Sequence, residues 1–167
     1  MTASGGTAIC PGTYDPVTNG HLDIIGRAAR VFDRVVVGVV GNAPRKLEHM
    51  FTADERKAFI EDALAANGVT NVEVAIFRNL LVEFAREHGA TAIVKGLRAI
   101  SDFEYEFEMN QLNRKLAPEI ESIYVIASPD YSFLSSTGVK EMAIFGADVS
   151  DLVPAAVAAA LAAHARR

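Results

Sequence analysis

The sequence predicts an α/β fold in one domain over residues 1–167, with five parallel strands and helices on both faces of the sheet. Two observations predict it. Short apolar runs alternate with segments of helical periodicity, and no linker or repeat interrupts them before an alanine-rich end. Two βαβ halves with right-handed crossovers give strand order 3-2-1-4-5. We therefore expect a doubly wound, Rossmann-like sheet, with a ligand crevice beyond the carboxyl ends of the first and fourth strands.

Each expected strand is a short apolar run. The second run, at 35–40, is almost entirely valine, which is typical of a parallel strand buried on both faces. Cys10 ends the first run, and as the single cysteine it favours a packing role over a redox role. The runs expected as strands are 8–10, 35–40, 72–77, 91–94 and 122–127.

The segments between these runs carry helix signals. Asn19 is a suitable N-cap for a first helix, and Thr52 with Glu55 forms a capping box for a second. Gly89 closes a third helix, and Pro118 stops a longer fourth helix. The expected helices are 20–32, a helix that starts at 52, 80–88, 102–116, one from the 135–137 hydroxyl cluster to near 146, and a C-terminal helix from 154.

Composition excludes several classes of protein. A hydrophobic content of 50% argues against disorder, and a net charge of −5 with a pI near 5.4 argues against a general nucleic-acid binder. The N-terminus lacks the regions of a signal peptide, and no stretch predicts a membrane span. We expect a cytoplasmic protein that holds any anionic substrate with local basic residues.

Common catalytic motifs are missing from the sequence. It contains no P-loop, no G-x-G-x-x-G dinucleotide fingerprint and no G-x-S-x-G nucleophile elbow. The four histidines do not form a spaced metal motif with one another or with Cys10, so no protein metal ligands are expected.

The segment 11–21 has the features of a phosphate-handling turn between a strand and a helix. Its glycines and prolines let the backbone turn sharply and approach a ligand closely. His21 falls in the first turn of the expected helix, where free N–H groups and the helix dipole attract anions. An ordinary Gly/Pro loop with a surface histidine is the alternative interpretation of this segment taken alone.

Further candidate phosphate ligands follow the other strands. Taken singly, a lysine or arginine is most often a solvated surface charge, but these all coincide with strand ends. Parallel topology would bring them to one edge of the sheet. The set comprises Thr13, His21, Arg45, Lys46, Lys95, Arg98 and the hydroxyl cluster Ser135, Ser136 and Thr137.

These residues carry a family resemblance. Thr13 with Asn19-Gly20-His21 resembles the (H/T)-x-G-H motif of nucleotidyltransferases, and the hydroxyl cluster resembles their second, serine-rich motif. Together with the segments 95–98, 102–106 and 131–136, they resemble the bacterial phosphopantetheine adenylyltransferase family over nearly the whole chain. The resemblance implies transfer of an adenylyl group from ATP to 4′-phosphopantetheine with Mg²⁺ present, giving dephospho-coenzyme A and pyrophosphate. It also implies a homo-hexamer.

The resemblance also implies roles for individual residues. His21, Thr13, Lys46 and Arg98 would be catalytic, with His21 stabilising the transition state at the α-phosphate. Thr13, Lys46, Leu81 and Lys95 would hold 4′-phosphopantetheine. ATP would be bound by Thr13, Tyr14, His21, Gly96, Leu97, Arg98, Glu106, Tyr131, Ser132, Phe133, Leu134, Ser135, Ser136 and Thr137.

The sequence departs from the family pattern at two places. The loop 45–51 is about two residues longer than usual, so Lys46 is favoured for the pantetheine phosphate, with Arg45 second. Thr137 stands where a third serine is expected, but it retains a hydroxyl. The alternatives are a related transferase acting on another phosphate, and a nucleotide-binding regulatory module without chemistry. Thr13, His21, Lys46 and Arg98 together argue against such a module.

Overall fold

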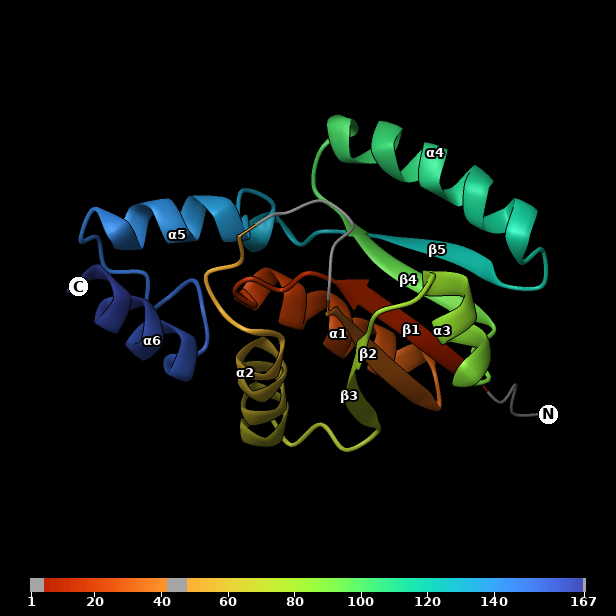
Figure 1. The fold of residues 1–167 in the computed structure, drawn as a ribbon, viewed down its shortest axis with the longest axis horizontal. Coiled ribbons are helices and arrows are strands. Elements are labelled where there is room, and N and C mark those ends of the chain that lie inside the picture. The colour runs from red at the N-terminus through yellow and green to blue at the C-terminus, as the bar shows by residue number, and fades with distance from the viewer. Residues whose placement is uncertain (1–4, 42–47, 167) are drawn as a thin grey trace.

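The structure, a computed structural model, describes residues 5–41 and 48–166. Its five strands are β1 (Thr7–Gly12), β2 (Arg34–Val40), β3 (Val72–Phe77), β4 (Ala92–Leu97) and β5 (Glu121–Ile126). All neighbouring strands run parallel, in the order β3-β2-β1-β4-β5 (Figure 1). The doubly wound sheet and its strand order, both predicted from the sequence, are confirmed.

Helices cover both faces of this sheet (Figure 1). On one face lie α1 (Asn19–Val31) and α2 (Ala53–Ala66), and the core there extends to α5 (Ser136–Ile144) and α6 (Ala155–Ala165). The other side carries α3 (Leu81–Glu87) and α4 (Ile100–Leu116). A 3-10 turn, η1 (Pro129–Tyr131), links β5 to the segment that begins α5.

The core follows the alternation of side chains along the strands. Ile9 and Val36 point into the cluster under α3, whereas Val35 and Val37 point into the larger cluster under α1 and α2. Cys10 belongs to the larger cluster at 2% exposure, and burial raises the pKa of its thiol to about 12. A protonated thiol in an apolar core supports the packing role expected of it.

The two central strands separate toward their carboxyl ends. β1 and β4 pair only at Ala8 with Ala92 and at Ile9 with Ile93. On their outer sides, β1 pairs with β2 as far as Gly12, and β4 pairs with β5 as far as Leu97. The sheet is therefore split at the point where strand order reverses, as expected for a ligand crevice.

Two local expectations are corrected by the structure. The residue that caps α1 is Thr18 rather than Asn19, because the Thr18 hydroxyl accepts the His21 N–H while the Asn19 amide donates to the Asp151 carbonyl. β4 runs on to Leu97, because β5 pairs with it that far, so Lys95 and Gly96 belong to the strand and not to a loop after it.

The remaining helices agree closely with expectation, although α4 begins at Ile100 and none of its residues is buried. None of the helices in the described ranges combines the length and the apolarity that a bilayer crossing requires.

Candidate active site

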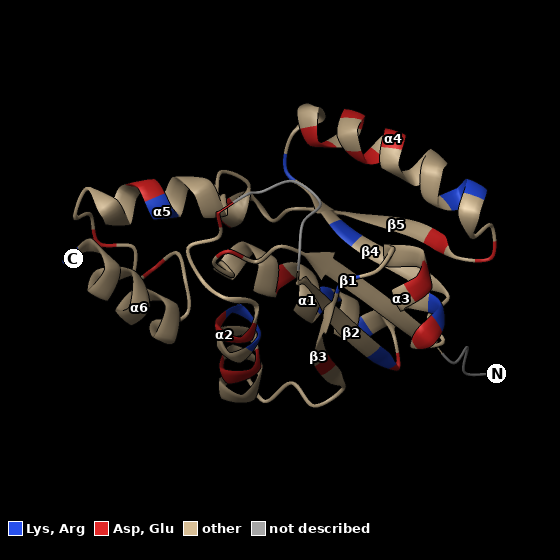
Figure 2. Ribbon diagram, in the orientation of Figure 1, with Lys and Arg blue, Asp and Glu red and all other residues tan. Residues whose placement is uncertain are grey.

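A cavity of about 550 Å³ occupies the split in the sheet. Its walls are residues 10–12 of β1, 94–96 of β4, the first two turns of α1 and α4, and Tyr131 with residues 134–137 at the start of α5. The predicted juxtaposition of the loops after the first and fourth strands is confirmed. Figure 2 shows basic positions at the carboxyl end of β4 and in the loop that leads to α4, so positive charge is local in this acidic chain.

His21 faces this cavity from the first turn of α1. Its Nδ1 accepts the Thr18 backbone N–H at 3.0 Å and lies 3.1 Å from the Thr18 hydroxyl. Because a backbone N–H can only donate, Nδ1 carries no proton, and the ring's single proton is on Nε2. Burial, with a smaller contribution from the Arg98 cation, lowers the pKa of His21 to about 4. At neutral pH, His21 is therefore an uncharged N–H donor.

The turn after β1 has a constrained backbone. Tyr14 adopts a φ of +53°, a left-handed conformation that is costly for a bulky residue. Its hydroxyl donates to the Cys10 carbonyl at 2.9 Å, and its ring meets the His21 ring edge-on with centroids 5.1 Å apart. A Cβ at Gly12 would lie 2.8 Å from the Tyr14 ring, so this close approach requires glycine.

Arg98 forms part of the opposite wall. Its Nη1 donates to the Leu134 carbonyl at 2.6 Å and its Nε to Asp102 Oδ2 at 3.3 Å. Burial alone would raise the pKa of Asp102, but the hydrogen bonds from the Arg98 backbone and side chain bring it below its ordinary value. The guanidinium is therefore held in place on the cavity wall by an ionised carboxylate and a carbonyl.

Lys95 and Glu106 meet inside the cavity. The Lys95 Nζ donates to Glu106 Oε2 at 2.7 Å, and both side chains are largely buried. The family resemblance implies that Lys95 binds 4′-phosphopantetheine and that Glu106 binds ATP. In the structure, these two side chains form an ion pair with each other.

The beginning of α5 forms another wall. The Ser135 hydroxyl accepts the Gly138 N–H at 3.0 Å and caps the helix, while the Ser136 hydroxyl donates to the Pro16 carbonyl at 2.8 Å. The cavity is therefore lined by the N-terminal turns of both α1 and α5. Helix N-termini favour anions through their free N–H groups and dipoles.

Most of the residues proposed from the sequence line the cavity. They are Tyr14, His21, Lys95, Gly96, Arg98, Glu106, Tyr131, Leu134, Ser135, Ser136 and Thr137. Thr13 is exposed beside it, and its carbonyl accepts a hydrogen bond from Arg56. Leu81 packs against the core under α3. Leu97, Ser132 and Phe133 are also outside the lining, and Arg45 and Lys46 lie outside the described residues.

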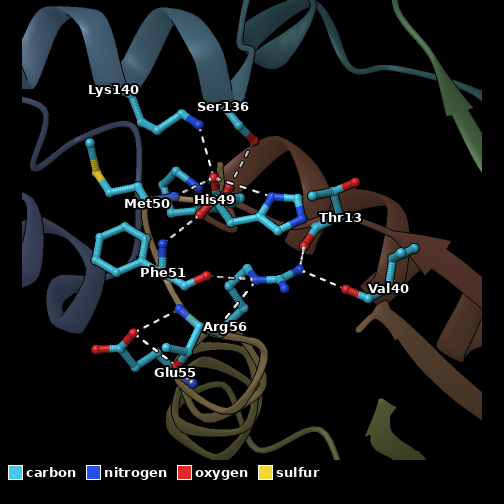
Figure 3. Close-up of polar contacts among 12 residues, drawn as sticks. Thr13, Val40, His49, Met50, Phe51, Glu55, Arg56, Ser136 and Lys140 are labelled. Carbon is cyan, nitrogen blue, oxygen red and sulfur yellow. Dashed lines mark hydrogen bonds and ion pairs between the residues drawn. The ribbon is translucent and has the colours of Figure 1, made fainter. Parts of the chain in front are cut away.

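Three charged residues next to the site were not predicted from the sequence. Asp15, Arg56 and Lys140 form a polar cluster: Lys140 bonds Asp15, and Asp15 and Arg56 both bond the Phe51 backbone. Figure 3 labels Arg56, Phe51 and Lys140 of this cluster. Asp15 lies within the segment already singled out, so its position was a signal. Arg56 gave none, because an arginine in a polar stretch of a helix is most often solvated.

The carboxylates of the cavity are already engaged. In the described ranges there is no cluster of three or more histidine, cysteine or carboxylate side chains suited to a metal ion. Asp102 and Glu106 line the cavity, but each pairs with a basic side chain. A hard cation such as Mg²⁺, which keeps waters and takes ligands from substrate phosphates, suits this arrangement without a protein cage.

The neutral His21, the Arg98 guanidinium and two helix N-termini line a split in a parallel sheet, an arrangement that suits an anionic ligand. The model of the cytidylyltransferase-like family matches residues 9–142. Chains named phosphopantetheine adenylyltransferase from Heliobacterium modesticaldum and Alkaliphilus metalliredigens are 50% and 51% identical, over 93% and 92% of this chain and 90% and 95% of their own. The chain therefore belongs to the phosphopantetheine adenylyltransferase family, within the cytidylyltransferase-like nucleotidyltransferases.

A solved structure supports the fold. It is a bifunctional NMN adenylyltransferase/ADP ribose pyrophosphatase from Francisella tularensis, complexed with AMP and a manganese ion. The TM-score is 0.67 at 16% identity, over 97% of this chain and 49% of that one.

Proposed function

We propose that the cavity transfers the adenylyl group of ATP to 4′-phosphopantetheine, giving dephospho-coenzyme A and pyrophosphate. The observation that carries this proposal is the neutral His21, which lines the cavity opposite Arg98 and whose Nε2–H bonds no other residue in the described ranges. Such a donor can stabilise negative charge as it develops on an α-phosphate.

Adenylyl transfer to a phosphate requires little proton transfer. A phosphate oxygen of 4′-phosphopantetheine attacks the α-phosphorus of ATP, and the bond from that phosphorus to the bridging oxygen of the β-phosphate breaks. Pyrophosphate leaves with the electron pair of that bond. Because the attacking phosphate is already anionic, positioning and charge neutralisation supply most of the rate, and no strong base is needed.

ATP is proposed to lie along the wall formed by β4, α4 and the start of α5. Gly96, Arg98 and Glu106 are the contacts from the β4 side, with Leu97 beside them. The α5 side contributes Tyr131 and residues 134–137, where the hydroxyls of Ser135, Ser136 and Thr137 meet a helix N-terminus. Tyr14 and His21 complete the site at the α-phosphate. For Ser132 and Phe133, which lie outside the lining, the assignment rests on the family resemblance.

4′-Phosphopantetheine is proposed to enter on the Thr13 side. Lys95 would exchange its contact with Glu106 for a substrate phosphate, and Lys46, or failing it Arg45, would provide a second cation. Leu81 is proposed for the pantetheine arm on the family resemblance.

Mg²⁺ is proposed to arrive with ATP. It would neutralise charge on the triphosphate and the departing pyrophosphate, with phosphate and water oxygens as its main ligands. His21 and Arg98 would orient the α-phosphate.

We further propose that the chain works in the cytoplasm as a homo-hexamer. Large apolar side chains of α4 support assembly: Ile100, Phe103, Tyr105, Phe107, Leu112 and Leu116 are each more than half exposed. An exposed apolar surface of this kind is typical of an interface between proteins.

A pyrophosphate-release assay with ATP and 4′-phosphopantetheine tests the proposal. We expect turnover with this pair, and much less when CTP replaces ATP or when pantetheine, which lacks the attacking phosphate, replaces the acceptor. No turnover with the proposed pair would contradict the assignment. Faster turnover with CTP would favour a related cytidylyltransferase, and ATP binding without turnover would favour a regulatory module.

A further inference from the structure

Arg56 is almost fully buried, at 1% exposure, and its hydrogen bonds to the described residues all go to backbone carbonyls. Its Nη1 donates to Thr13 O at 2.6 Å and to Val40 O at 3.0 Å, and its Nε donates to Phe51 O at 3.1 Å (Figure 3). These carbonyls come from the turn after β1, the end of β2 and the approach to α2. One planar guanidinium therefore joins three chain segments, which few other side chains can do.

Asp15 bonds the same approach to α2, through backbone N–H groups rather than carbonyls. Its Oδ1 accepts the Phe51 N–H at 2.9 Å, and its Oδ2 accepts the Met50 N–H at 3.0 Å and the Lys140 ammonium at 2.9 Å. His49 Nδ1 lies 3.9 Å from Oδ2. Burial would raise the pKa of Asp15, but the hydrogen bonds from Lys140 and from the two amides bring it below its ordinary value. Asp15 is therefore an ionised acceptor at neutral pH.

Asp15 and Arg56 both hydrogen-bond the backbone of Phe51. Phe51 gives its N–H to Asp15 and its carbonyl to Arg56, and its ring is buried against Phe59 and His164. These bonds connect the turn that carries Thr13 to Phe51, whose ring is buried just before α2. We name Asp15, Arg56 and Lys140 the turn clamp.

A structural role alone does not account for this choice of residues. Burial of a guanidinium is costly even with the Asp15 charge nearby, and a well-packed apolar side chain of similar volume is often as stable or more stable. The turn clamp acts instead where geometry matters for chemistry. Arg56 bonds the Thr13 carbonyl directly. Asp15 follows Tyr14 in the chain, and Tyr14, in its left-handed conformation, contacts the His21 ring.

We propose that Asp15 and Arg56 are positioning residues for adenylyl transfer, which fix the turn carrying Thr13 and the start of α1 carrying His21 at the cavity. Lys140 supports them by fixing Asp15 from α5. This inference rests on the proposed function, because it concerns the placement of Thr13 and His21 during transfer. Neither Asp15 nor Arg56 lines the cavity.

The experiment compares Arg56→Met, Arg56→Lys, Asp15→Asn and Lys140→Met with Arg86→Met. Arg86 is the control for loss of an arginine away from the site: it is exposed, donates to the Glu119 carboxylate and the Leu116 carbonyl, and lies outside the cavity lining. The measurements are kcat, the KM for ATP, and hydrogen exchange of the backbone amides in the segment 12–18.

Arg56→Met and Asp15→Asn are expected to lower kcat about 10- to 100-fold, the order of loss caused by misplaced reacting groups, while the KM for ATP changes less than about threefold. Lys140→Met should show a smaller loss of kcat. Arg56→Lys should recover only part of the loss, because an ammonium lacks the planar fork. Amide exchange in the segment 12–18 should become faster in the Arg56 and Asp15 variants and stay unchanged in Arg86→Met.

Folded Arg56 or Asp15 variants with wild-type kcat, or with wild-type amide exchange in the segment 12–18, would overturn the proposal. Full activity in Arg56→Lys would also overturn it, because charge rather than the fork would then suffice. If Arg56→Met does not fold, Arg56→Lys and Lys140→Met decide by the same two measurements. Failure of the wild type to release pyrophosphate refutes the proposed function instead, and the exchange measurement still tests the turn clamp.

Discussion

His21 shows how the local fold sets the chemistry of one side chain. The residue that caps α1, Thr18, gives its N–H to Nδ1 and so leaves the ring proton on Nε2, on the side free to meet a ligand. Burial and the Arg98 cation keep the ring neutral. A neutral imidazole still donates its Nε2–H to an oxyanion, and the reaction needs no base from it.

The ionisation of His21 can be measured directly. A nitrogen-15 NMR titration of the free protein should give a His21 midpoint near pH 4, with the proton on Nε2 above it. Because the folded pKa lies below the ordinary 6.5, the stability that neutral His21 contributes is complete above pH 6.5 and is lost as the pH falls toward 4. A midpoint near 6.5, or a proton on Nδ1, would contradict the assignment.

Replacement of His21 separates binding from chemistry. His21→Ala should keep the affinity for ATP largely unchanged in calorimetric titration, because the other walls of the cavity remain. It should cut turnover by about 10²-fold or more, as for other lost transition-state donors. Equal losses of binding and turnover would mean that His21 only holds the ground state.

At the scale of elements, a capping box begins both α1 and α2, but only the one in α1 includes a cavity residue. Both α1 and α2 begin with a threonine that bonds the third helical residue reciprocally. In α1 the third residue is His21, at the cavity, whereas in α2 it is Glu55, which lies outside the cavity lining. The pair offers a comparison within one chain.

Thr18→Ala and Thr52→Ala should each lower the free energy of unfolding by about 1 kcal/mol, the usual value of such a cap, as measured by urea unfolding. Only Thr18→Ala should also lower kcat, by several-fold, because His21 then loses the hydroxyl beside Nδ1. Similar kcat values in the two variants would show that the α1 cap is structural alone.

Much of the element pattern could be predicted from the sequence because burial on both faces leaves a clear mark. The valine run of β2 and the helix signals between strands were enough for the strand order. The end of β4 could not be predicted from the sequence, since Lys95 and Gly96 look like loop residues and only their pairing with β5 places them in the strand. Nor could Thr18 be told from Asn19, since both residue types cap helices well.

The site was predictable where residues sit in a local motif, and not where they meet through tertiary packing. Tyr14, His21 and the segment 135–137 belong to short motifs and do line the cavity. Arg56 reaches Thr13 across 43 positions of sequence, and no local pattern marks that contact. Arg45 and Lys46 lie outside the described residues, so their assignment stays a prediction.

At the scale of the whole molecule, the two sides of the sheet differ. The core under α1, α2, α5 and α6 is extensive, whereas α4 buries none of its residues and exposes an apolar surface. Ile126, at the end of the edge strand β5, is 68% exposed and adds to the apolar area on the chain's surface. This unequal covering supports the proposed assembly of several copies.

Light scattering coupled to gel filtration tests that assembly. The wild type should have six times the 17.9 kDa mass of the chain. Phe107→Arg should shift the mass toward smaller species, because a charge would have to be buried at the interface. Val31→Arg, at a residue that is also exposed but belongs to α1, is the control and should leave the mass unchanged. A wild-type monomer would contradict the proposal.

The transfer of label from ATP tests the central claim, adenylyl transfer at the split of the sheet, most directly. Wild-type protein is incubated with 4′-phosphopantetheine and ATP labelled either at the α- or at the γ-phosphate, and the products are separated. We expect the α label in dephospho-coenzyme A and the γ label in pyrophosphate, with His21→Ala slowed about 10²-fold in both. A γ label on the acceptor, or no label on the acceptor from either ATP, would contradict it.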